Sequence, residues 1–386
     1  MKAPKVLIVA TEFPPGPGGI GTHAWETARW LKEYGWEVRV RACQDYVSRA
    51  ESELFREKAG FEIRSLCGVR MPGLRLPYLA CGSWADVSSW RPDIVLATGR
   101  NAVMAAGAAG RGSARLAAVA HGTEILAGRV FRKLTLRAFQ AADLVVAVSG
   151  FTARKLAECG VARERVAVVP NGADEGVFRP ASEKEARAVR RELGLGSGAS
   201  ILTVGHVSER KGQWVIARAL GEVARQIPDV EYWVVGLPTE KERVETVARE
   251  AGVADRVRFL GRLPQGDLVK LVQACDVFAM TSVMTAGGDY EGYGIAVLEA
   301  ALCGKPAVVS DCGGLPEAVE DGETGLIVRE RDARATAQAL IRILGDSAMR
   351  RRMGERARAK ALEEGTWRGR IRQYHGLLRG LLGGKA

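Results

Sequence analysis

The chain alternates short apolar runs with longer segments in which apolar residues recur every three or four positions. The first run, Lys5–Ala10 (K-V-L-I-V-A), is typical of a strand buried on both faces of a parallel sheet. Thr22–Tyr34, with apolar residues at helical spacing, predicts a helix directly after it. Such alternation predicts an α/β fold. The other predicted strands are Glu37–Ala42, Asp93–Ala97, Leu116–Ala120, Asp143–Ser149, Val166–Pro170, Ile201–Val204, Tyr232–Gly236, Val257–Phe259, Val277–Met280 and Ala307–Ser310.

The alternation is interrupted once, between Phe178 and Ser200. This segment holds a proline, a charge-rich helix over Ser182–Leu193 and a run of glycines, which are typical of a connector. A length of 386 residues also favours two domains. We therefore predict an N-terminal domain over residues 1–185, a second β/α domain over 186–366 and a C-terminal helix over 367–386.

One stretch, Tyr290–Ala301 (Y-E-G-Y-G-I-A-V-L-E-A-A), combines two carboxylates with two glycines and an apolar run. It predicts a glycine-rich turn that opens a helix, whose N-terminal N–H groups attract an anion such as phosphate. The glycines let a ligand approach the backbone closely. Carboxylates at Glu291 and Glu299 suit a nucleotide-sugar, which carries hydroxyls on either side of a diphosphate. An ordinary helix with a solvated glutamate at each end stays an alternative.

A second glycine loop, P-P-G-P-G-G-I-G at residues 14–21, separates the first predicted strand from the first predicted helix. Strand, glycine loop and helix is the arrangement of a phosphate cradle. The G-x-G-x-x-G fingerprint of dinucleotide-binding domains does not fit, because the glycines are too crowded and no acidic residue ends the strand Glu37–Ala42. A tight turn without a ligand stays an alternative.

The stretch E-G-Y-G-I-A-V-L-E-A resembles the E-x7-E signature of family 4 glycosyltransferases, retaining enzymes of the GT-B fold. Further motifs similar to the family's lie in the same order from residue 14 to residue 328, most of them at the ends of predicted strands. H-G-T-E and G-G-D-Y-E-G-Y-G look most like the phosphatidylinositol mannosyltransferase branch. The resemblance implies two Rossmann-like domains facing across a cleft, with the last helix crossing back to the N-terminal domain. The other matched motifs are P-P-x-x-G-G-x-G at 14–21, P-N-G-A-D at 170–174, G-H-V-S-E-R-K-G at 205–212, G-G-L-P-E at 313–317 and G-E-T-G at 322–325.

The resemblance implies that the C-terminal domain binds the nucleotide-sugar. It assigns Lys211 to the diphosphate, Glu291 to the donor sugar and Glu299 to the ribose. His206 stands where the family has a phosphate-binding arginine, which puts the usual two-cation clamp in doubt, although Arg210 is close enough in sequence to compensate. A protonated His206 would donate from both ring nitrogens, which predicts donor affinity that falls as pH rises. The remaining donor-side candidates are Gly19, Gly21, Gly292, Tyr293 and Gly294.

The N-terminal domain is expected to take the acceptor. His121 follows the strand Leu116–Ala120, at the edge where parallel sheets bind ligands. The matched motif implies that it borders the donor sugar, so the catalytic candidates are His121, Lys211 and Glu291. Glu124 and Asn171 match family positions and are acceptor-side candidates. The sequence identifies no residue as a nucleophile, so a double displacement and a same-face substitution both stay open.

The net positive charge of the chain limits which kinds of binding partner the sequence favours. The formal net charge is +11, and residues 1–185 hold 26 lysines and arginines against 19 acidic residues. Arginines on one face of the predicted helix Ala127–Ala141 suggest an anionic membrane surface, with a solvated helix face as the alternative. Nucleic acid is disfavoured because no zinc-finger or RNA-binding signature accompanies the charge. No uncharged apolar stretch reaches the 18 residues typical of a membrane span.

These observations predict a glycosyltransferase that moves a hexose from a GDP- or UDP-linked donor to a hydroxyl of a lipid or cell-envelope glycan. Two alternatives of the same fold are an epimerase acting on the donor alone and a non-catalytic nucleotide-sugar-binding protein. No cofactor and no metal are expected, because no D-x-D metal motif stands apart from the glycine turn. Seven cysteines without C-x-x-C pairs and without an export signal predict a cytoplasmic protein, with peripheral docking on the inner face of the membrane as a second possibility.

Overall fold

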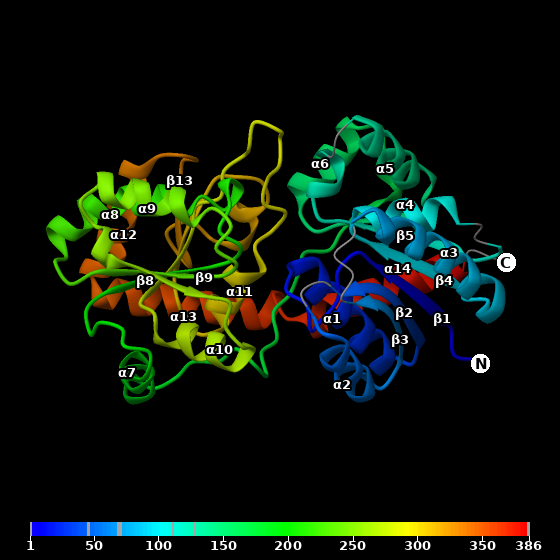
Figure 1. Cartoon of the computed structure of the whole chain (residues 1–386), viewed down its shortest axis with the longest axis horizontal. Helices are drawn as coiled ribbons and strands as arrows, with labels where there is room; N and C mark the ends of the chain where they lie inside the picture. Colours follow the sequence, from blue (N-terminus) through cyan, green and yellow to red (C-terminus); the bar gives the residue numbers. More distant parts are fainter. Residues whose placement is uncertain (1, 45–46, 68–71, 110–111, 127–128, 384–386) are drawn as a thin grey trace. The chain divides into compact units, whose positions relative to one another are not determined.

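The computed structural model describes residues 2–44, 47–67, 72–109, 112–126 and 129–383 (Figure 1). The chain forms two compact units, each built on one parallel sheet. Unit 1 comprises Met1–Asn171 together with Trp367–Ala386, and unit 2 comprises Gly172–Thr366. The predicted α/β class with two Rossmann-like domains is confirmed.

The sheet of unit 1 has seven parallel strands in the order β3-β2-β1-β4-β5-β6-β7. The apolar run predicted as the first strand lies at its centre, where Val6 pairs with Val38 on one side and Ile94 on the other. Residues from Val6 to Ala10 are fully buried, as expected for a strand covered on both faces. The strands are β1 Lys5–Ala10, β2 Glu37–Gln44, β3 Glu62–Cys67, β4 Ile94–Thr98, β5 Arg115–Ala120, β6 Leu144–Ala147 and β7 Val166–Val168.

The helices of unit 1 connect these strands, and the last helix of the chain joins them. This helix, α14, packs against α1. Their contact includes a buried hydrogen bond between His23 and Tyr374. The helices of unit 1 are α1 Gly19–Glu33, α2 Arg49–Ala59, α3 Pro72–Trp90, α4 Arg100–Ala108, α5 Arg129–Ala141, α6 Gly150–Glu158 and α14 Trp367–Gly383, with short 3-10 turns η1 Thr123–Leu126 and η2 Arg163–Arg165.

Unit 2 has a sheet of six parallel strands in the order β10-β9-β8-β11-β12-β13. The strands are β8 Ser200–Val204, β9 Glu231–Val235, β10 Val257–Gly261, β11 Val277–Met280, β12 Ala307–Ser310 and β13 Gly325–Val328. The helices are α7 Glu183–Glu192, α8 Gln213–Gln226, α9 Lys241–Glu250, α10 Gln265–Ala274, α11 Ile295–Leu302, α12 Ala333–Gly345 and α13 Ser347–Glu364, with 3-10 turns η3 Glu209–Lys211, η4 Ala254–Arg256 and η5 Leu315–Ala318.

In both sheets the strand order reverses beside the first strand of the unit. In unit 1, β1 lies between β2 and β4, and in unit 2, β8 lies between β9 and β11. Ligands of open α/β sheets bind outside the carboxyl ends of the strands at such a reversal. The loops after β1, β4 and β5 in unit 1, and after β8, β11 and β12 in unit 2, are therefore where a site is expected.

The boundary between the units differs from the prediction, since it follows Asn171 and not residue 185. Residues 172–185 are held by unit 2 through main-chain and side-chain contacts. The Ala173 amide donates to Gly365 O at 2.8 Å. Gln273 Nε2 donates to Arg179 O at 2.7 Å, and α7 packs on α10. The change of composition therefore marks a segment that belongs to the second unit.

Three elements between residues 43 and 110 were not predicted, namely β3, α3 and α4. β3 is an edge strand with one buried residue, so its apolar signal is weak. α3 contains Pro77, a residue that normally interrupts helices. The pairing of this region depends on distant charges, because the fully buried Asp86 accepts a hydrogen bond from Arg41 of β2 at 2.6 Å. Such long-range pairing leaves no local pattern.

Candidate functional site

The loop after β8 in unit 2 is fastened to the end of β11. Gly212 has a left-handed backbone (φ 66°), and a Cβ atom there would lie 1.9 Å from Thr281 O, so the position requires glycine. Thr281 Oγ1 donates to Gly212 O at 2.9 Å. The Val283 amide donates to Arg210 O at 2.7 Å. These bonds fix the main chain of Arg210 and Lys211 beside the segment that leads into the E-x7-E stretch.

Two cations of this loop contact one carboxylate of that stretch. Arg210 Nη1 lies 2.6 Å and Lys211 Nζ 2.7 Å from Glu291 Oε2. Arg210 Nε also lies 3.4 Å from Asp289 Oδ2. All but Asp289 are largely buried, with side-chain exposures of 21% for Arg210, 13% for Lys211 and 11% for Glu291. We call these four residues the ion cluster.

Burial and the neighbouring charges set the protonation of the ion cluster. Burial alone would raise the pKa of Glu291, but Lys211 and Arg210 outweigh it and lower that pKa to about 2. Burial lowers the pKa of Lys211, and Glu291 opposes this shift. Glu291 is therefore ionised throughout the neutral pH range, and its charge is balanced by its two cation partners.

The glycine turn before α11 has the geometry that the sequence predicted. Gly294, with φ 93°, precedes the first helical residue, and no side chain caps the helix there. The Val297 amide already donates to Gly294 O at 3.0 Å, so an anion would be received by the N–H groups nearer the helix start. Gly292 and Tyr293 are buried within the turn. A Cβ atom at Gly313 would lie 2.2 Å from Glu291 O, so the glycine loop after β12 packs closely on the ion cluster.

The second carboxylate of the motif has a different environment. Glu299 lies one turn into α11 and is partly buried. Burial raises its pKa to about 7. Burial is the cause of that shift, whereas Lys211 and Arg210 lower the pKa of Glu291. Glu299 therefore exchanges its proton near neutral pH.

His206 does not contact the ion cluster through a hydrogen bond in the part of unit 2 that the structure describes. Its Nε2 is hydrogen-bonded to Thr239 Oγ1, and its carbonyl accepts from Gln213 Nε2 at 3.1 Å. Burial, Arg210 and Lys211 lower its pKa. In the folded chain His206 is thus neutral at neutral pH. To bind a phosphate in its protonated form, His206 would have to take up a proton when a diphosphate binds.

In unit 1 the histidine predicted at the sheet edge is held by a hydroxyl. Thr98 Oγ1, at the end of β4, lies 2.8 Å from His121 Nε2. His121 N donates to Glu124 Oε2 at 3.0 Å. Burial lowers the pKa of His121 to about 3 and raises that of Glu124 to about 7. The histidine is therefore neutral, and Glu124 holds its main chain in place.

A second buried histidine supports the first. The His23 ring packs edge-on against His121, with centroids 5.0 Å apart. His23 Nε2 is hydrogen-bonded to Tyr374 of α14 at 2.9 Å, and Trp367 packs on the same ring at 5.8 Å. Burial, and then His121, lower the pKa of His23. We call Thr98, His121, His23, Tyr374 and Glu124 the neutral network.

The remaining candidates of unit 1 are not joined to this network by hydrogen bonds within the described residues. Gly19 is exposed at the start of α1. Gly21 is needed for packing, because a Cβ there would lie 3.2 Å from Phe13 N. Asn171 is buried, and its Oδ1 has no hydrogen-bond partner in the described part of the chain.

Sequence reasoning missed Thr98, His23 and Tyr374, and Asp289 entered it only as part of the motif G-G-D-Y-E-G-Y-G. The one available signal was that His23 follows the glycine loop and Thr98 ends an apolar run. Within the described ranges, no group of three His, Cys, Asp or Glu residues is arranged to hold a metal ion.

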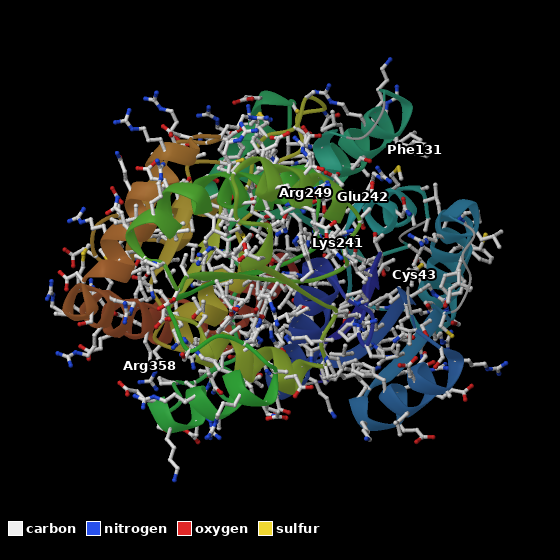
Figure 2. All side chains as sticks on the ribbon, turned by 60° about the vertical axis from the view of Figure 1, so that its left-hand side comes forward. Cys43, Phe131, Lys241, Glu242, Arg249 and Arg358 are labelled. Atoms are coloured by element: carbon white, nitrogen blue, oxygen red, sulfur yellow. The ribbon has the colours of Figure 1, made fainter. Side chains whose placement is uncertain are left out.

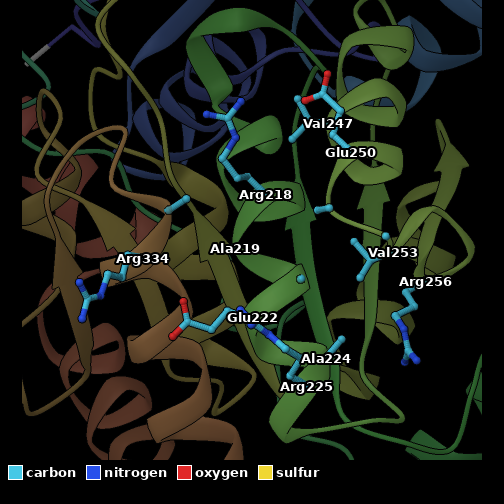
Figure 3. Close-up of a pocket in the computed structure, with 14 residues that line it drawn as sticks. Arg218, Ala219, Glu222, Ala224, Arg225, Val247, Glu250, Val253, Arg256 and Arg334 are labelled. Carbon is cyan, nitrogen blue, oxygen red and sulfur yellow. The ribbon is translucent and has the colours of Figure 1, made fainter.

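A groove of about 740 Å³ lies elsewhere on unit 2 (Figure 3). It is bounded by α8, α9 and the start of α12, and its lining includes arginine and glutamate side chains such as Arg218, Arg334 and Glu222. It contains none of the residues of the ion cluster. The groove is therefore separate from the candidate site.

Comparison with known proteins identifies the family. The description "Glycosyltransferase Family 4" matches residues 17–176, and "Glycosyl transferases group 1" matches residues 187–360. The chain is 31% identical to the GDP-mannose-dependent alpha-(1-6)-phosphatidylinositol monomannoside mannosyltransferase of Mycolicibacterium smegmatis, over 97% of this chain and 98% of that protein. It is also 31% identical, over 94% of each chain, to the GDP-mannose-dependent monoacylated alpha-(1-6)-phosphatidylinositol monomannoside mannosyltransferase of Corynebacterium glutamicum.

Solved structures share the fold. Anabaena HepE in complex with UDP-glucose superposes with a TM-score of 0.81 at 22% identity, covering 97% of this chain and 99% of that one. Sucrose-phosphate synthase from Thermosynechococcus elongatus gives a TM-score of 0.79 at 20% identity, covering 99% and 100%. With the full-length sequence relatives, these matches show that the chain belongs to glycosyltransferase family 4 and is a nucleotide-sugar glycosyltransferase.

Proposed function

We propose that this protein transfers a hexose, first of all mannose from GDP-mannose, to a hydroxyl of an inositol-bearing lipid, with retention of anomeric configuration. The observation that carries the proposal is the ion cluster beside the uncapped start of α11. Lys211 and Arg210 supply two cations for a diphosphate, and the α11 amides supply further donors. The choice of mannose and of the lipid rests on the names of the full-length relatives.

In the proposed reaction the bond between the anomeric carbon and the β-phosphate oxygen breaks, and a bond to the acceptor oxygen forms. The departing diphosphate carries the electron pair, and the proton of the acceptor hydroxyl passes to a diphosphate oxygen. Lys211, Arg210 and the α11 amides stabilise the charge that develops on the diphosphate. Glu291 and neutral His121 hydrogen-bond the donor sugar, and Glu299 the ribose. Glu124 and Asn171 are assigned to the acceptor side.

Because the ion cluster and the α11 amides supply two cations and further hydrogen-bond donors for a diphosphate, we propose that transfer needs no metal ion. Activity is then expected to persist in excess chelator. Complete loss, restored by a divalent cation, would contradict this assignment provided that the unfolding temperature is unchanged.

The function is tested by supplying the purified protein with GDP-mannose, UDP-glucose and related donors, with and without phosphatidylinositol-type lipids. Transfer is followed by mass spectrometry of the lipid, and the donor pool is analysed for epimers. A glycolipid formed only when both substrates are present supports the proposal. Conversion of the donor without an acceptor would indicate the epimerase alternative, and binding without any turnover would indicate a binding protein.

A lipid acceptor requires contact with a membrane, and α5 offers a surface for it. Phe131, labelled in Figure 2, is 51% exposed. Leu134 is 44% exposed, and Arg132, Lys133 and Arg137 are also exposed on this helix. Apolar side chains flanked by cations are typical of helices that lie on anionic lipid surfaces. In the described part of the chain, no helix is both long and apolar enough to cross a bilayer. We propose that the protein docks on the cytoplasmic face through α5.

Docking is tested by sedimentation with phosphatidylglycerol vesicles and with neutral vesicles. Reversing the charge of both Arg132 and Lys133 should weaken binding to anionic vesicles by about 1 kcal/mol or more for each residue, most clearly at low salt. Arg249→Glu on α9 of unit 2 serves as a control of the same chemistry (Figure 2). Equal binding to both vesicle types would contradict the proposal of docking on an anionic surface and would favour a soluble acceptor.

A further inference from the structure

The ion cluster places one carboxylate oxygen where a phosphate oxygen is expected. Both Arg210 Nη1 and Lys211 Nζ point to the same atom, Glu291 Oε2, at 2.6 and 2.7 Å. Ser282 Oγ lies 3.5 Å from that atom as well. A diphosphate that uses both cations must therefore take them from Glu291.

The ion cluster also has no net charge. Arg210 and Lys211 contribute two positive charges, and Glu291 and Asp289 contribute two negative charges. A diphosphate thus approaches a cluster that is already neutralised, and its binding depends on exchange of partners. An ionised carboxylate left buried without hydrogen-bond donors is strongly unfavourable.

The main chain around the cluster limits how this exchange can occur. The Gly314 amide donates to Glu291 O at 2.8 Å, and the Val283 amide donates to Arg210 O at 2.7 Å. The backbones on both sides of the ion pairs are thus fixed, so the exchange must be made by the side chains. Glu291 has to find new donors within reach of its own side chain.

We infer that Glu291 makes the site selective for a nucleotide that carries a sugar over the bare nucleoside diphosphate. This inference rests on the proposed function, in which Glu291 accepts hydrogen bonds from the donor sugar. With the sugar present, its hydroxyls replace the cations as partners of Glu291 when the diphosphate takes Arg210 and Lys211. With the product, the hexose hydroxyls are absent, so Glu291 keeps competing for the cations and the product is bound weakly.

The test is calorimetric titration of GDP, UDP, GDP-mannose and UDP-glucose into the wild-type chain and the Glu291→Gln variant. Removing the competing charge should tighten binding of the preferred nucleoside diphosphate about tenfold. The variant also loses charged hydrogen bonds to the sugar, so the preference for donor over product should fall by more than tenfold. If Glu291 only contacted the sugar and did not compete for the cations, Glu291→Gln would leave the affinity for the product unchanged.

Two further variants keep the inference open to refutation. Asp289 is 41% exposed and pairs only with Arg210 among the ion pairs of this cluster, so Asp289→Asn should fold normally and tighten product binding about threefold. Glu320, which pairs with Lys360 at 2.6 Å and Arg356 at 3.4 Å elsewhere in unit 2, is the matched control. Glu320→Gln should leave both affinities unchanged.

The outcomes separate the inference from the proposed function. If the wild-type chain binds the donor and Glu291→Gln binds the product no more tightly, the inference is wrong and the proposed function stands. If the variant unfolds, unchanged product affinity in Asp289→Asn overturns the inference equally. If the wild-type chain binds no nucleotide at all, the proposed function fails, and the inference fails with it.

Discussion

The two units place chemically opposite groups at the equivalent edge of similar sheets. In unit 2 the strand ends carry the ion cluster, in which Arg210 and Lys211 contact Glu291 within 2.7 Å. In unit 1 they carry the neutral network, in which burial keeps His121 uncharged and a hydroxyl holds its ring. Ion pairs can exchange one anion for another, whereas a network of neutral groups mainly fixes a shape. Under the proposed function, this difference predicts that unit 2 governs nucleotide affinity and unit 1 governs turnover.

The largest effect is expected from removing a cation of unit 2. Lys211→Ala deletes a charged partner of the diphosphate and leaves Glu291 with one cation fewer. Losing a hydrogen bond to a charged group costs about 1.5–3 kcal/mol, so transfer should fall about ten- to hundredfold. The measurement is kcat/KM for the donor. Lys241→Ala, which removes an exposed lysine paired with Glu245 on α9, is the control and should retain full activity (Figure 2).

Removing one hydroxyl of unit 1 should have a smaller effect of a different kind. Thr98→Val keeps the shape of the side chain but cannot hydrogen-bond His121 Nε2. A neutral hydrogen bond contributes about 0.5–1.5 kcal/mol, so kcat should fall about two- to tenfold while KM for the donor stays constant. Thr98→Ser restores the hydroxyl and should recover most of kcat. Equal losses in both variants would show that packing at Thr98, and not its hydroxyl, is what matters.

The sequence predicted the parts of the site that lie close together along the chain. The turn and helix from Glu291 to Glu299 are one local motif, and Lys211 follows directly from its strand and loop. Of the neutral network only His121 and Glu124 could be predicted, because Thr98 and His121 are 23 residues apart and His23 and Tyr374 are 351 apart. Only the fold of unit 1 brings their side chains together.

The same limit applies to the partners of the predicted clamp. The motif predicts His206 beside the diphosphate, and only the fold shows that its ring is hydrogen-bonded to Thr239 after β9. The partner of Arg210 could not be read either, because Arg210 and Glu291 are 81 residues apart. Strands, helices and loop positions follow from local patterns, but the pairing of charges follows from tertiary contact.

Glu124 of unit 1 and Glu291 of unit 2 should also respond to pH on opposite limbs of the stability curve. The pKa of Glu124 is about 7 in the folded chain against an ordinary 4.5, so the unfolded state releases this proton first and stability falls as pH rises from 4.5 to 7. The pKa of Glu291 is lowered to about 2, so its contribution is present above 4.5 and is lost as pH falls toward 2.

Glu124→Gln should therefore flatten the change in unfolding free energy between pH 4.5 and 7, by about 1–3 kcal/mol, and leave the acid limb as it is. Denaturant unfolding at a series of pH values measures both limbs. The difference between wild type and variant isolates Glu124 from His121 and Glu299, which titrate in the same range. Parallel curves for the two proteins would show that Glu124 keeps its ordinary pKa.

The smallest effect is expected at His206. Its lowered pKa makes it neutral, so His206→Arg adds a permanent charge near Lys211 and should tighten nucleoside diphosphate binding about threefold. The variant should also bind with little dependence on pH, whereas the wild type should bind more weakly as pH rises, because its histidine must take up a proton. Identical pH profiles in calorimetry would leave Lys211 and Arg210 as the side-chain cations of the site.

One measurement tests the division of labour between the units most directly. Calorimetric titration of GDP and UDP into the wild type, Lys211→Ala and Thr98→Val separates affinity from turnover. The account predicts that Lys211→Ala loses nucleotide affinity at least about tenfold and that Thr98→Val binds like the wild type despite its lower kcat. Weaker nucleotide binding by Thr98→Val, or undiminished binding by Lys211→Ala, would contradict it.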